Sequence, residues 1–212
     1  MPAPVINIDP EDPASKVIEE AASFIKEGGV VCYPTRSLYG LGADAFNANA
    51  VDRIFAIKKR SQQKPILVLI NHPGQLTQLV RRVPSSAVKL MQRFWPGWLT
   101  IVFEARDTLP DNLTAGSGKI GVRLAGHAVA LALTEEVQSP ITGTSANLSG
   151  RPGCHRVDNL EPQIIRQVDL VLDAGALKGG KGSTVVDVCN GNPRILREGE
   201  LTAQEISTIL GS

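Results

Sequence analysis

Apolar residues recur along this chain at the spacings typical of helices and of strands. Helical spacing follows Asp12-Pro13, a pair typical of an N-cap with proline at the first helical position, and it stops at Gly28-Gly29. A second helix is predicted over residues 51–57, after a loop that runs from Pro34 to about residue 47. The remaining predicted helices cover residues 84–94, residues 127–137 and the end of the chain, which begins with a capping box at residues 202–205.

Short apolar runs between these helices predict strands. The run over residues 66–70 is continuous, which is typical of an inner strand covered on both faces. Strands and helices interleave, and some strands are neighbours in sequence, so we expect an α/β fold with a mixed sheet. No linker or internal repeat divides the chain, which predicts a single domain over residues 1–212. The predicted strands are 30–33, 66–70, 99–103, 120–124, 169–172, 184–188 and 194–196.

The most informative polar segment is Thr144-Ser145-Ala146-Asn147-Leu148-Ser149-Gly150, called the polar run below. Its hydroxyls rotate to suit a partner, and the asparagine amide offers two donors and an acceptor. Small hydrogen-bonding side chains at a strand end suit a phosphate or carboxylate ligand. The same residue types are also typical of a tight turn without a ligand, so the segment alone leaves both interpretations open.

Charge and cysteine content narrow the classes of function. The chain has 22 Lys and Arg against 21 Asp and Glu, a net charge of +1, so a nucleic-acid role would need a local basic patch. Cys32, Cys154 and Cys189 are odd in number and lack metal-ligand spacing, which predicts reduced thiols. The first residues lack the features of a signal peptide, and no apolar stretch reaches the roughly 18 residues of a membrane span. We therefore expect a cytoplasmic protein with no membrane segment.

A glycine-rich segment imitates a nucleotide-binding loop without meeting its structural requirements. Gly175 and Gly180-Lys181 have the spacing of a Walker A motif. Gly182, however, stands where a hydroxyl should hold magnesium, and a predicted strand follows where the motif needs a helix N-terminus. The three histidines are scattered along the chain, so we expect neither a metal site nor a catalytic triad.

Cations and hydroxyls collect where the predicted strands end. Lys58 and Arg60 close the second predicted helix; they either complement the helix dipole or bind a ligand at the mouth of the sheet. Arg123 ends an apolar strand, where a guanidinium is costly to bury without an anionic partner. A rim of this kind, with no evident nucleophile or general base, would catalyse by positioning and charge stabilisation. The strand ends present Thr35, Arg123, Thr144, Ser145, Asn147, Ser183 and Arg197.

Seven motifs follow one another along the chain. They are Tyr33-Pro34-Thr35 with Tyr39-Gly40-Leu41-Gly42, Ile57-Lys58-Lys59-Arg60, Trp95-Pro96-Gly97, Gly121-Val122-Arg123-Leu124, the polar run, Ser183-Thr184-Val185-Val186-Asp187 and Ile195-Leu196-Arg197-Glu198-Gly199. As a set they resemble the YrdC-like family, which includes the threonylcarbamoyl-AMP synthases. The resemblance covers roughly residues 13–200. It implies a twisted, open mixed sheet flanked by helices, with a concave cationic groove, and no extra C-terminal domain of the kind found in longer members.

The resemblance also implies an activity, that of a nucleotidyltransferase. The reaction would combine L-threonine, bicarbonate and ATP into L-threonylcarbamoyl-AMP and release pyrophosphate. Lys58 and Arg60 match a motif that contacts nucleotide phosphates, and they are the expected catalytic cations. Ser145 and Asn147 match a pair that also faces ATP, and Arg197 matches an arginine on the nucleotide side.

Other positions match the part of the site that receives threonine and its carbamate: Thr35, Arg123, Thr144 and Ser183. Mg²⁺ would bridge the ATP phosphates and keep several waters, which fits the lack of a dense carboxylate cluster. Which carboxylate would touch the ion stays open among Asp44, Asp173 and Asp187. The product would serve t6A modification of tRNA at A37, which points to tRNA, or the tRNA threonylcarbamoyltransferase complex, as a partner.

An alternative interpretation is a YrdC-like protein that binds RNA without catalysis. Lys89 and three arginines, at positions 81, 82 and 93, would then supply the basic patch. The net charge of +1 weighs against strong affinity for a phosphate backbone, because such affinity needs many cations. A third interpretation is a module that transfers a carbamoyl group from carbamoyl phosphate, although such modules are normally joined to further domains.

Overall fold

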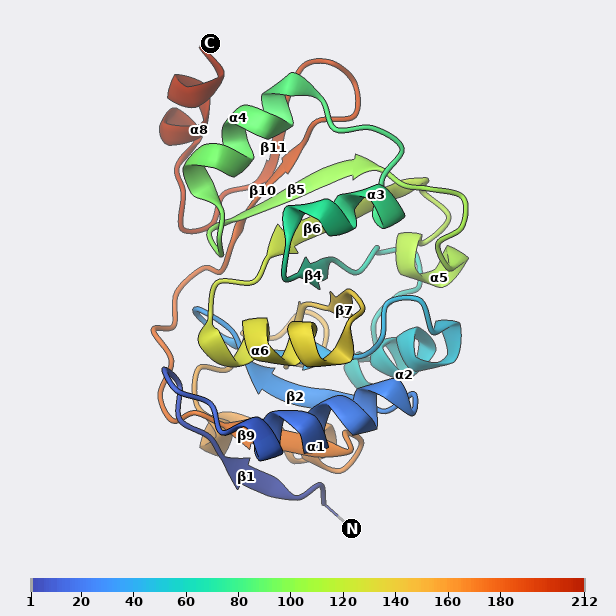
Figure 1. Cartoon of the computed structure of the whole chain (residues 1–212), viewed down its shortest axis with the longest axis vertical. Coiled ribbons are helices and arrows are strands. Elements are labelled where there is room, and N and C mark those ends of the chain that lie inside the picture. The colour runs from blue at the N-terminus through green and yellow to red at the C-terminus, as the bar shows by residue number, and fades with distance from the viewer. Residues whose placement is uncertain (1, 212) are drawn as a thin grey trace.

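Two mixed sheets form the centre of the protein. The computed structural model describes residues 2–211, with β1 (Val5–Asn7) and α8 (Ala203–Leu210) at opposite ends (Figure 1). The predicted α/β class with mixed pairing is confirmed, but two sheets take the place of the single sheet expected. The first sheet has the order β1, β9 (Leu170–Asp173), β2 (Val31–Pro34), β3 (Tyr39–Gly42), β8 (Thr144–Ser145). The second has the order β11 (Arg194–Arg197), β10 (Thr184–Asp187), β5 (Leu99–Glu104), β6 (Lys119–Leu124), β4 (Val68–Ile70), β7 (Ile141–Thr142).

Helices cover both sheets (Figure 1). The first sheet is covered by α1 (Ser15–Lys26) and α6 (Ala128–Val137), and α6 also contacts β4, so it bridges the two sheets. The second sheet is covered by α4 (Ser85–Phe94), which packs against α8. The remaining helices are α2 (Ala48–Lys58), α3 (Leu76–Leu79), α5 (Asp111–Thr114), α7 (Pro162–Ile165) and two 3₁₀ turns, η1 (Pro73–Gln75) and η2 (Val157–Asn159).

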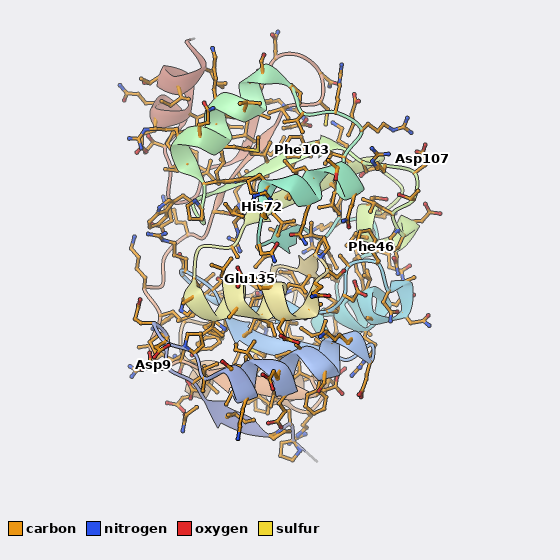
Figure 2. The ribbon with its side chains drawn as sticks, viewed as in Figure 1. Asp9, Phe46, His72, Phe103, Asp107 and Glu135 are labelled. Atoms are coloured by element: carbon orange, nitrogen blue, oxygen red, sulfur yellow. The ribbon has the colours of Figure 1, made fainter. Side chains whose placement is uncertain are left out.

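The apolar side chains pack into two clusters, each of which contains residues of both sheets. The second sheet contributes Phe103, which lies inside the upper half of the molecule in Figure 2, to a cluster that also contains Ile54 of α2 and Leu90 of α4. Ile25 of α1 and Leu133 of α6 pack on the first sheet in the other cluster. Burying each such side chain stabilises the fold by roughly 1.5–3 kcal/mol, so these two clusters hold the sheets in place.

The structure corrects the predicted start of the first helix. α1 begins at Ser15 with Ala14 as its N-cap, and no side chain caps it. Asp12 is not the cap, because its backbone N–H donates to the Asp9 carboxylate at 3.0 Å, in a turn before the helix. Pro13 lies in the connection that follows this turn.

The predicted loop between Pro34 and residue 47 contains a strand that the pattern missed. β3 forms a hairpin with β2, in which Leu41 pairs with Cys32. Glycine has a weak strand propensity, which hid this element. Gly42 is nevertheless required, since a Cβ there would lie 2.8 Å from the Tyr33 ring. β1, β7 and β8 were also missed because each has only two or three residues, and β4 begins at Val68 instead of residue 66.

The chain crosses between the two sheets at three places. The first crossing runs from β3 through α2 to β4, the second from β7 to β8 at Gly143, and the third from β9 to β10 through residues 174–183. Gly143 admits no side chain, because a Cβ would meet Leu67 Cδ1 at 2.6 Å. The third crossing is rich in glycine for a backbone reason: Gly175, Gly179, Gly180 and Gly182 all have positive φ.

The three cysteines are buried and free, as the sequence predicted. Within residues 2–211, no helix combines the length and apolar character needed to cross a membrane.

Candidate functional site

A cavity of about 520 Å³ lies where strands of both sheets and the three crossings meet. The first sheet contributes β3 and β8 to its lining, and the second contributes β5, β6, β10 and β11. Of the nine predicted site residues, seven line this cavity although they come from distant parts of the sequence. They are Thr35, Arg60, Arg123, Thr144, Ser145, Ser183 and Arg197.

One face of the second sheet forms the floor of the cavity. Because side chains alternate along a strand, every second residue points to the same face. The lining residues follow this rule: Thr100 and Val102 on β5, Lys119, Gly121 and Arg123 on β6, and Val185 and Asp187 on β10. Gly121 adds no side chain to this floor. A Cβ there would lie close to its neighbours, 3.2 Å from Thr100 and 3.3 Å from Leu67.

The charges around the cavity are unbalanced. Six cationic side chains line it, and Asp187 is the one lining carboxylate among the residues that the structure describes. Asp187 is already paired, because Lys119 Nζ donates to its Oδ2 at 2.7 Å and the Cys189 backbone N–H donates to its Oδ1 at 2.9 Å. Burial raises the pKa of Asp187, but these bonds outweigh burial and hold it below its ordinary value. The cations are Arg60, Lys119, Arg123, Lys181, Arg194 and Arg197.

No lining guanidinium group has a carboxylate partner within residues 2–211, and three of the four, those of Arg60, Arg123 and Arg197, are partly desolvated. Arg60 donates to the backbone oxygens of Lys64 and Pro65, at 3.1 and 2.9 Å. Arg197 donates to the Ser183 backbone oxygen at 2.7 Å. For Arg123, the described residues provide neither a hydrogen-bond acceptor nor an ion pair.

Burial lowers the pKa of all three guanidinium groups. At Arg123, the Tyr33 hydroxyl partly opposes this shift, and the positive charge of Arg197 adds to it. Burial of like charges near one another is unfavourable unless an anion lies between them. The arrangement therefore provides a place for an anionic ligand.

Hydroxyl groups surround these cations. The Ser183 hydroxyl is 2.8 Å from that of Thr100, and both side chains line the cavity. Thr35 donates its hydroxyl hydrogen to the Leu38 backbone oxygen at 2.6 Å, which leaves its oxygen lone pairs as acceptors. Thr144 and Ser145 lie on β8, which pairs with β3 in the first sheet, and both side chains line the cavity. Such hydroxyls can bind the amine, hydroxyl or carboxylate of a small molecule.

Lys58 and Asn147, the two other predicted site residues, do not line the cavity. Lys58 is 1% exposed, and its Nζ donates to backbone oxygens of the polar run. Asn147 is also buried and donates through Nδ2 to the backbone oxygens of Leu148 and Arg151, at 2.8 and 2.7 Å. The structure thus brings both residues to the back of the cavity wall formed by Ser145.

Sequence reasoning missed several residues of the floor, including Thr100, Ser117, Lys119 and Arg194. The predicted strand over residues 120–124 began one residue too late to include Lys119. Alternation along β6 provides the signal that would have found it, because Lys119, Gly121 and Arg123 differ by two positions.

The three carboxylates considered for a metal ion have separate surroundings. Asp44 accepts a hydrogen bond from Ser139, and Asp173 accepts one from Tyr39; neither lines the cavity. In the part of the chain that the structure describes, no group of three or more His, Cys, Asp or Glu side chains could hold a metal ion. A divalent ion here would depend on oxygens brought by a ligand.

Comparison with known proteins places the chain among sequences of one family. The family model Sua5_yciO_yrdC, described as "Telomere recombination", matches residues 23–199. The threonylcarbamoyl-AMP synthase of Pyrococcus abyssi is 38% identical over 194 residues, which cover 92% of this chain and 57% of that protein. A putative threonylcarbamoyl-AMP synthase of Mycobacterium tuberculosis is 36% identical over 203 residues, which cover 96% of this chain and 93% of that protein. The chain therefore spans little more than half of the archaeal relative.

Solved structures agree with the sequence comparison. The crystal structure of P. abyssi Sua5 complexed with L-threonine superposes with a TM-score of 0.93 at 36% identity, covering 98% of this chain and 61% of that one. E. coli YciO superposes with a TM-score of 0.87 at 28% identity, covering 96% of this chain and 99% of that one. From the matched family model, the relatives and these structures, the chain belongs to the Sua5/YciO/YrdC family.

Proposed function

We propose that this protein is a nucleotidyltransferase that makes L-threonylcarbamoyl-AMP from L-threonine, bicarbonate and ATP, with release of pyrophosphate. The observation that carries the proposal is the single cavity in which Arg60, Arg123 and Arg197 face a common space without carboxylate partners. All three substrates carry negative charge that these groups would neutralise. Relatives named threonylcarbamoyl-AMP synthase, and a related structure that contains L-threonine, support the choice of substrates.

The amino-acid end of the site would lie at Arg123. A guanidinium fork binds a carboxylate through two parallel hydrogen bonds, and Arg123 has its donors available for this. Hydroxyls of Thr35, Thr144 and Ser183 would then bind the hydroxyl and carbamate of threonine. A site that hydrogen-bonds the threonine hydroxyl would reject valine, because valine leaves the partner group buried and unpaired.

The nucleotide end would use Arg60, Ser145 and Arg197. These side chains line the same cavity, and the arginines would offset the charge of the phosphates. Mg²⁺ would enter with ATP as part of the substrate, since the described residues offer no cluster of ligands for it. Such an ion is held by phosphate oxygens and waters.

The reaction would proceed in two chemical steps. The neutral threonine amine attacks bicarbonate, and N-carboxythreonine forms with loss of water. Its carboxylate oxygen then attacks the α-phosphorus of ATP, the bond to the bridging oxygen breaks, and pyrophosphate leaves. The protein contributes orientation by Arg123 and charge stabilisation by Arg60 and Arg197, and no step requires a nucleophile from the chain. The product would supply t6A modification at A37 of tRNA in the cytoplasm, through direct contact with tRNA or with the tRNA threonylcarbamoyltransferase complex.

The proposal is tested by measuring pyrophosphate release from ATP and bicarbonate with threonine, serine or valine. We expect release with threonine, together with a product whose mass is that of threonylcarbamoyl-AMP, and little release with valine. Pyrophosphate release that is independent of the amino acid, or no release in the presence of Mg²⁺, would refute it.

The same experiment separates the synthase from a non-catalytic RNA-binding protein. Two arginines of the suggested basic patch are already paired: Arg81 with Asp107, which lies at the outer edge of the molecule in Figure 2, and Arg82 with Glu104. This pairing reduces the free positive charge of that surface. RNA binding that depends steeply on salt, without any effect of ATP and without pyrophosphate release, would favour the RNA-binding interpretation.

A further inference from the structure

The C-terminal end of α2 is tied to the polar run by three hydrogen bonds. Lys58 Nζ donates to the backbone oxygens of Ser145 and Asn147, the latter at 2.7 Å. In return, the Ser149 backbone N–H donates to the Lys58 backbone oxygen at 2.8 Å. One lysine thus spans the segment from Ser145, which lines the cavity, to Ser149 behind it.

Lys58 is oriented inward by the helix itself. Val51, Ile54 and Lys58 occupy positions i, i+3 and i+7, which lie on one face of a helix, and this face of α2 is buried. The next residue, Lys59, takes the left-handed conformation with φ 48° and ends the helix. Arg60 is therefore released from the helical register, and its side chain reaches the cavity. Two cations separated by one residue consequently have different surroundings.

The ammonium group of Lys58 is held without a carboxylate bond. Burial and, to a smaller extent, the nearby Arg60 charge lower its pKa to about 8, with Glu161 opposing the shift. Glu161 is itself engaged, since it accepts from the Leu148 backbone N–H at 3.4 Å and lies 3.8 Å from the Arg151 guanidinium. The carbonyl oxygens of the polar run are thus the direct partners of Lys58 among the described residues.

The polar run has internal bonds that complete this arrangement. The Ser145 hydroxyl donates to Asn147 Oδ1, and Asn147 Nδ2 donates to the backbone oxygens of Leu148 and of Arg151, which follows the run. If Lys58 turned toward the cavity to reach a phosphate, the buried Asn147 carbonyl oxygen would lose the Lys58 donor, which is costly in a protein interior. The Ser145 carbonyl oxygen would keep only the Asn147 backbone N–H, which donates to it at 3.0 Å. The bonds therefore favour Lys58 staying where it is when a ligand binds.

We propose that Lys58 is a positioning residue that holds the cavity wall at Thr144 and Ser145 in shape, and that Arg60 is the cation of this helix end that touches the nucleotide. This inference deepens the proposed function and rests on it for the identity of the ligands. Thr144 lies on the threonine side of the proposed site and Ser145 on the nucleotide side. Displacement of this wall would therefore weaken the binding of both threonine and ATP, whereas loss of a direct phosphate contact would weaken the binding of ATP alone.

The test compares Lys58→Met with Arg60→Met, which removes a cation two positions away. Calorimetry measures binding of threonine and of ATP separately, and amide hydrogen exchange reports on residues 146–151. For Lys58→Met we expect both affinities to fall by about tenfold or more, the KM for both substrates to rise with kcat changed less, and exchange over 146–151 to increase. For Arg60→Met we expect ATP affinity alone to fall, with exchange unchanged.

A loss of ATP affinity in Lys58→Met with threonine affinity and exchange as in the wild type would overturn the proposal. Should Lys58→Met fold poorly, Asn147→Ala provides a second variant, because it removes the hydrogen bonds that the Asn147 side chain makes to the polar run and to Arg151. We expect it to weaken the binding of both threonine and ATP. Where both variants fold, the double variant should lose little more than the worse single variant, because residues that act as one unit are non-additive. Losses that multiply would contradict the proposal. Wild-type protein that binds neither ligand would refute the proposed function, while the exchange comparison would still decide the role of Lys58.

Discussion

The two faces of β5, β6 and β10 differ sharply in composition, although the same strands carry both. Phe103 on β5 and Val122 on β6 face the helices and are at most 1% exposed. Arg123 and Asp187, their neighbours on β6 and β10, face the cavity. A core would reject a guanidinium without a partner, so stability does not account for Arg123 on the cavity face. The comparison indicates that residues on the helix side hold the sheet, whereas arginines on the cavity side are available to an anionic ligand.

The substitution expected to disrupt the packing of the helix-facing side most strongly is Phe103→Ala. We expect it to lower the free energy of unfolding by about 3–5 kcal/mol, because a buried aromatic ring is replaced by a cavity. Urea unfolding followed by circular dichroism measures this change. Phe46, which lies near α2 at the surface in Figure 2 and is 36% exposed, provides the control, and Phe46→Ala should stay within about 0.5 kcal/mol of wild type. Equal losses in both variants would contradict the distinction.

The matching change on the cavity side is Arg123→Met. We expect threonine-dependent pyrophosphate release to fall by about 100-fold, since a bidentate bond to a carboxylate contributes about 3 kcal/mol. The melting temperature should stay the same or rise. A partly desolvated guanidinium without a carboxylate partner is unfavourable in the folded protein, and the substitution removes it. Arg123→Lys keeps the charge but loses the fork, and it should recover only part of the activity. Loss of stability without loss of activity would show that Arg123 has a structural role and not a role in binding the substrate.

A smaller effect is expected from filling the floor at Gly121. Gly121→Val adds a Cβ that would lie 3.2 Å from Thr100 and 3.3 Å from Leu67, and it adds two methyl groups beyond it. The new side chain should occupy part of the cavity and weaken ligand binding by about tenfold. Crowding against its neighbours should also lower the free energy of unfolding by about 1–3 kcal/mol. Gly121→Ala is the graded control and should fall between wild type and valine. Ligand affinity that is unchanged in both variants would show that the centre of the floor is not used.

The smallest expected effect concerns the Lys119–Asp187 pair, and it depends on pH. The pKa of Asp187 is held below 3.8, so its stabilisation is present above that pH and is lost as the pH falls through the native pKa. The pKa of Lys119 is raised above 10.5 by its bond to Asp187, so the same contribution is lost as the pH rises through the native value. Asp187→Asn should lower the free energy of unfolding by about 1 kcal/mol at neutral pH. This difference from wild type should shrink in acid, as measured by urea unfolding at each pH.

The helix-facing side of the sheet could be read from the sequence, whereas the cavity face could be read only in fragments. Apolar runs identified β5, β6 and β10 because burial demands apolar side chains wherever the chain runs. Arg123 and Arg197 stood out for the opposite reason, since each places a charge at the end of an apolar strand. Lys119 escaped notice because it is the first residue of its strand and lies outside the apolar run that identified the strand.

The sequence by itself determined the α/β class, most of the helices and longer strands, the motif set and the residue types available to a site. These depend on local periodicity and on backbone preferences, such as the positive φ at Gly175, Gly180 and Gly182. The tertiary structure alone decided that two sheets form instead of one, and that three crossings bring Arg60, Ser145 and Ser183 to one cavity. It also separated Lys58 from Arg60, because the end of a helix and the carbonyls facing it decide which of two neighbouring cations is buried. Convergence of this kind depends on contacts between residues far apart in sequence, which no local pattern records.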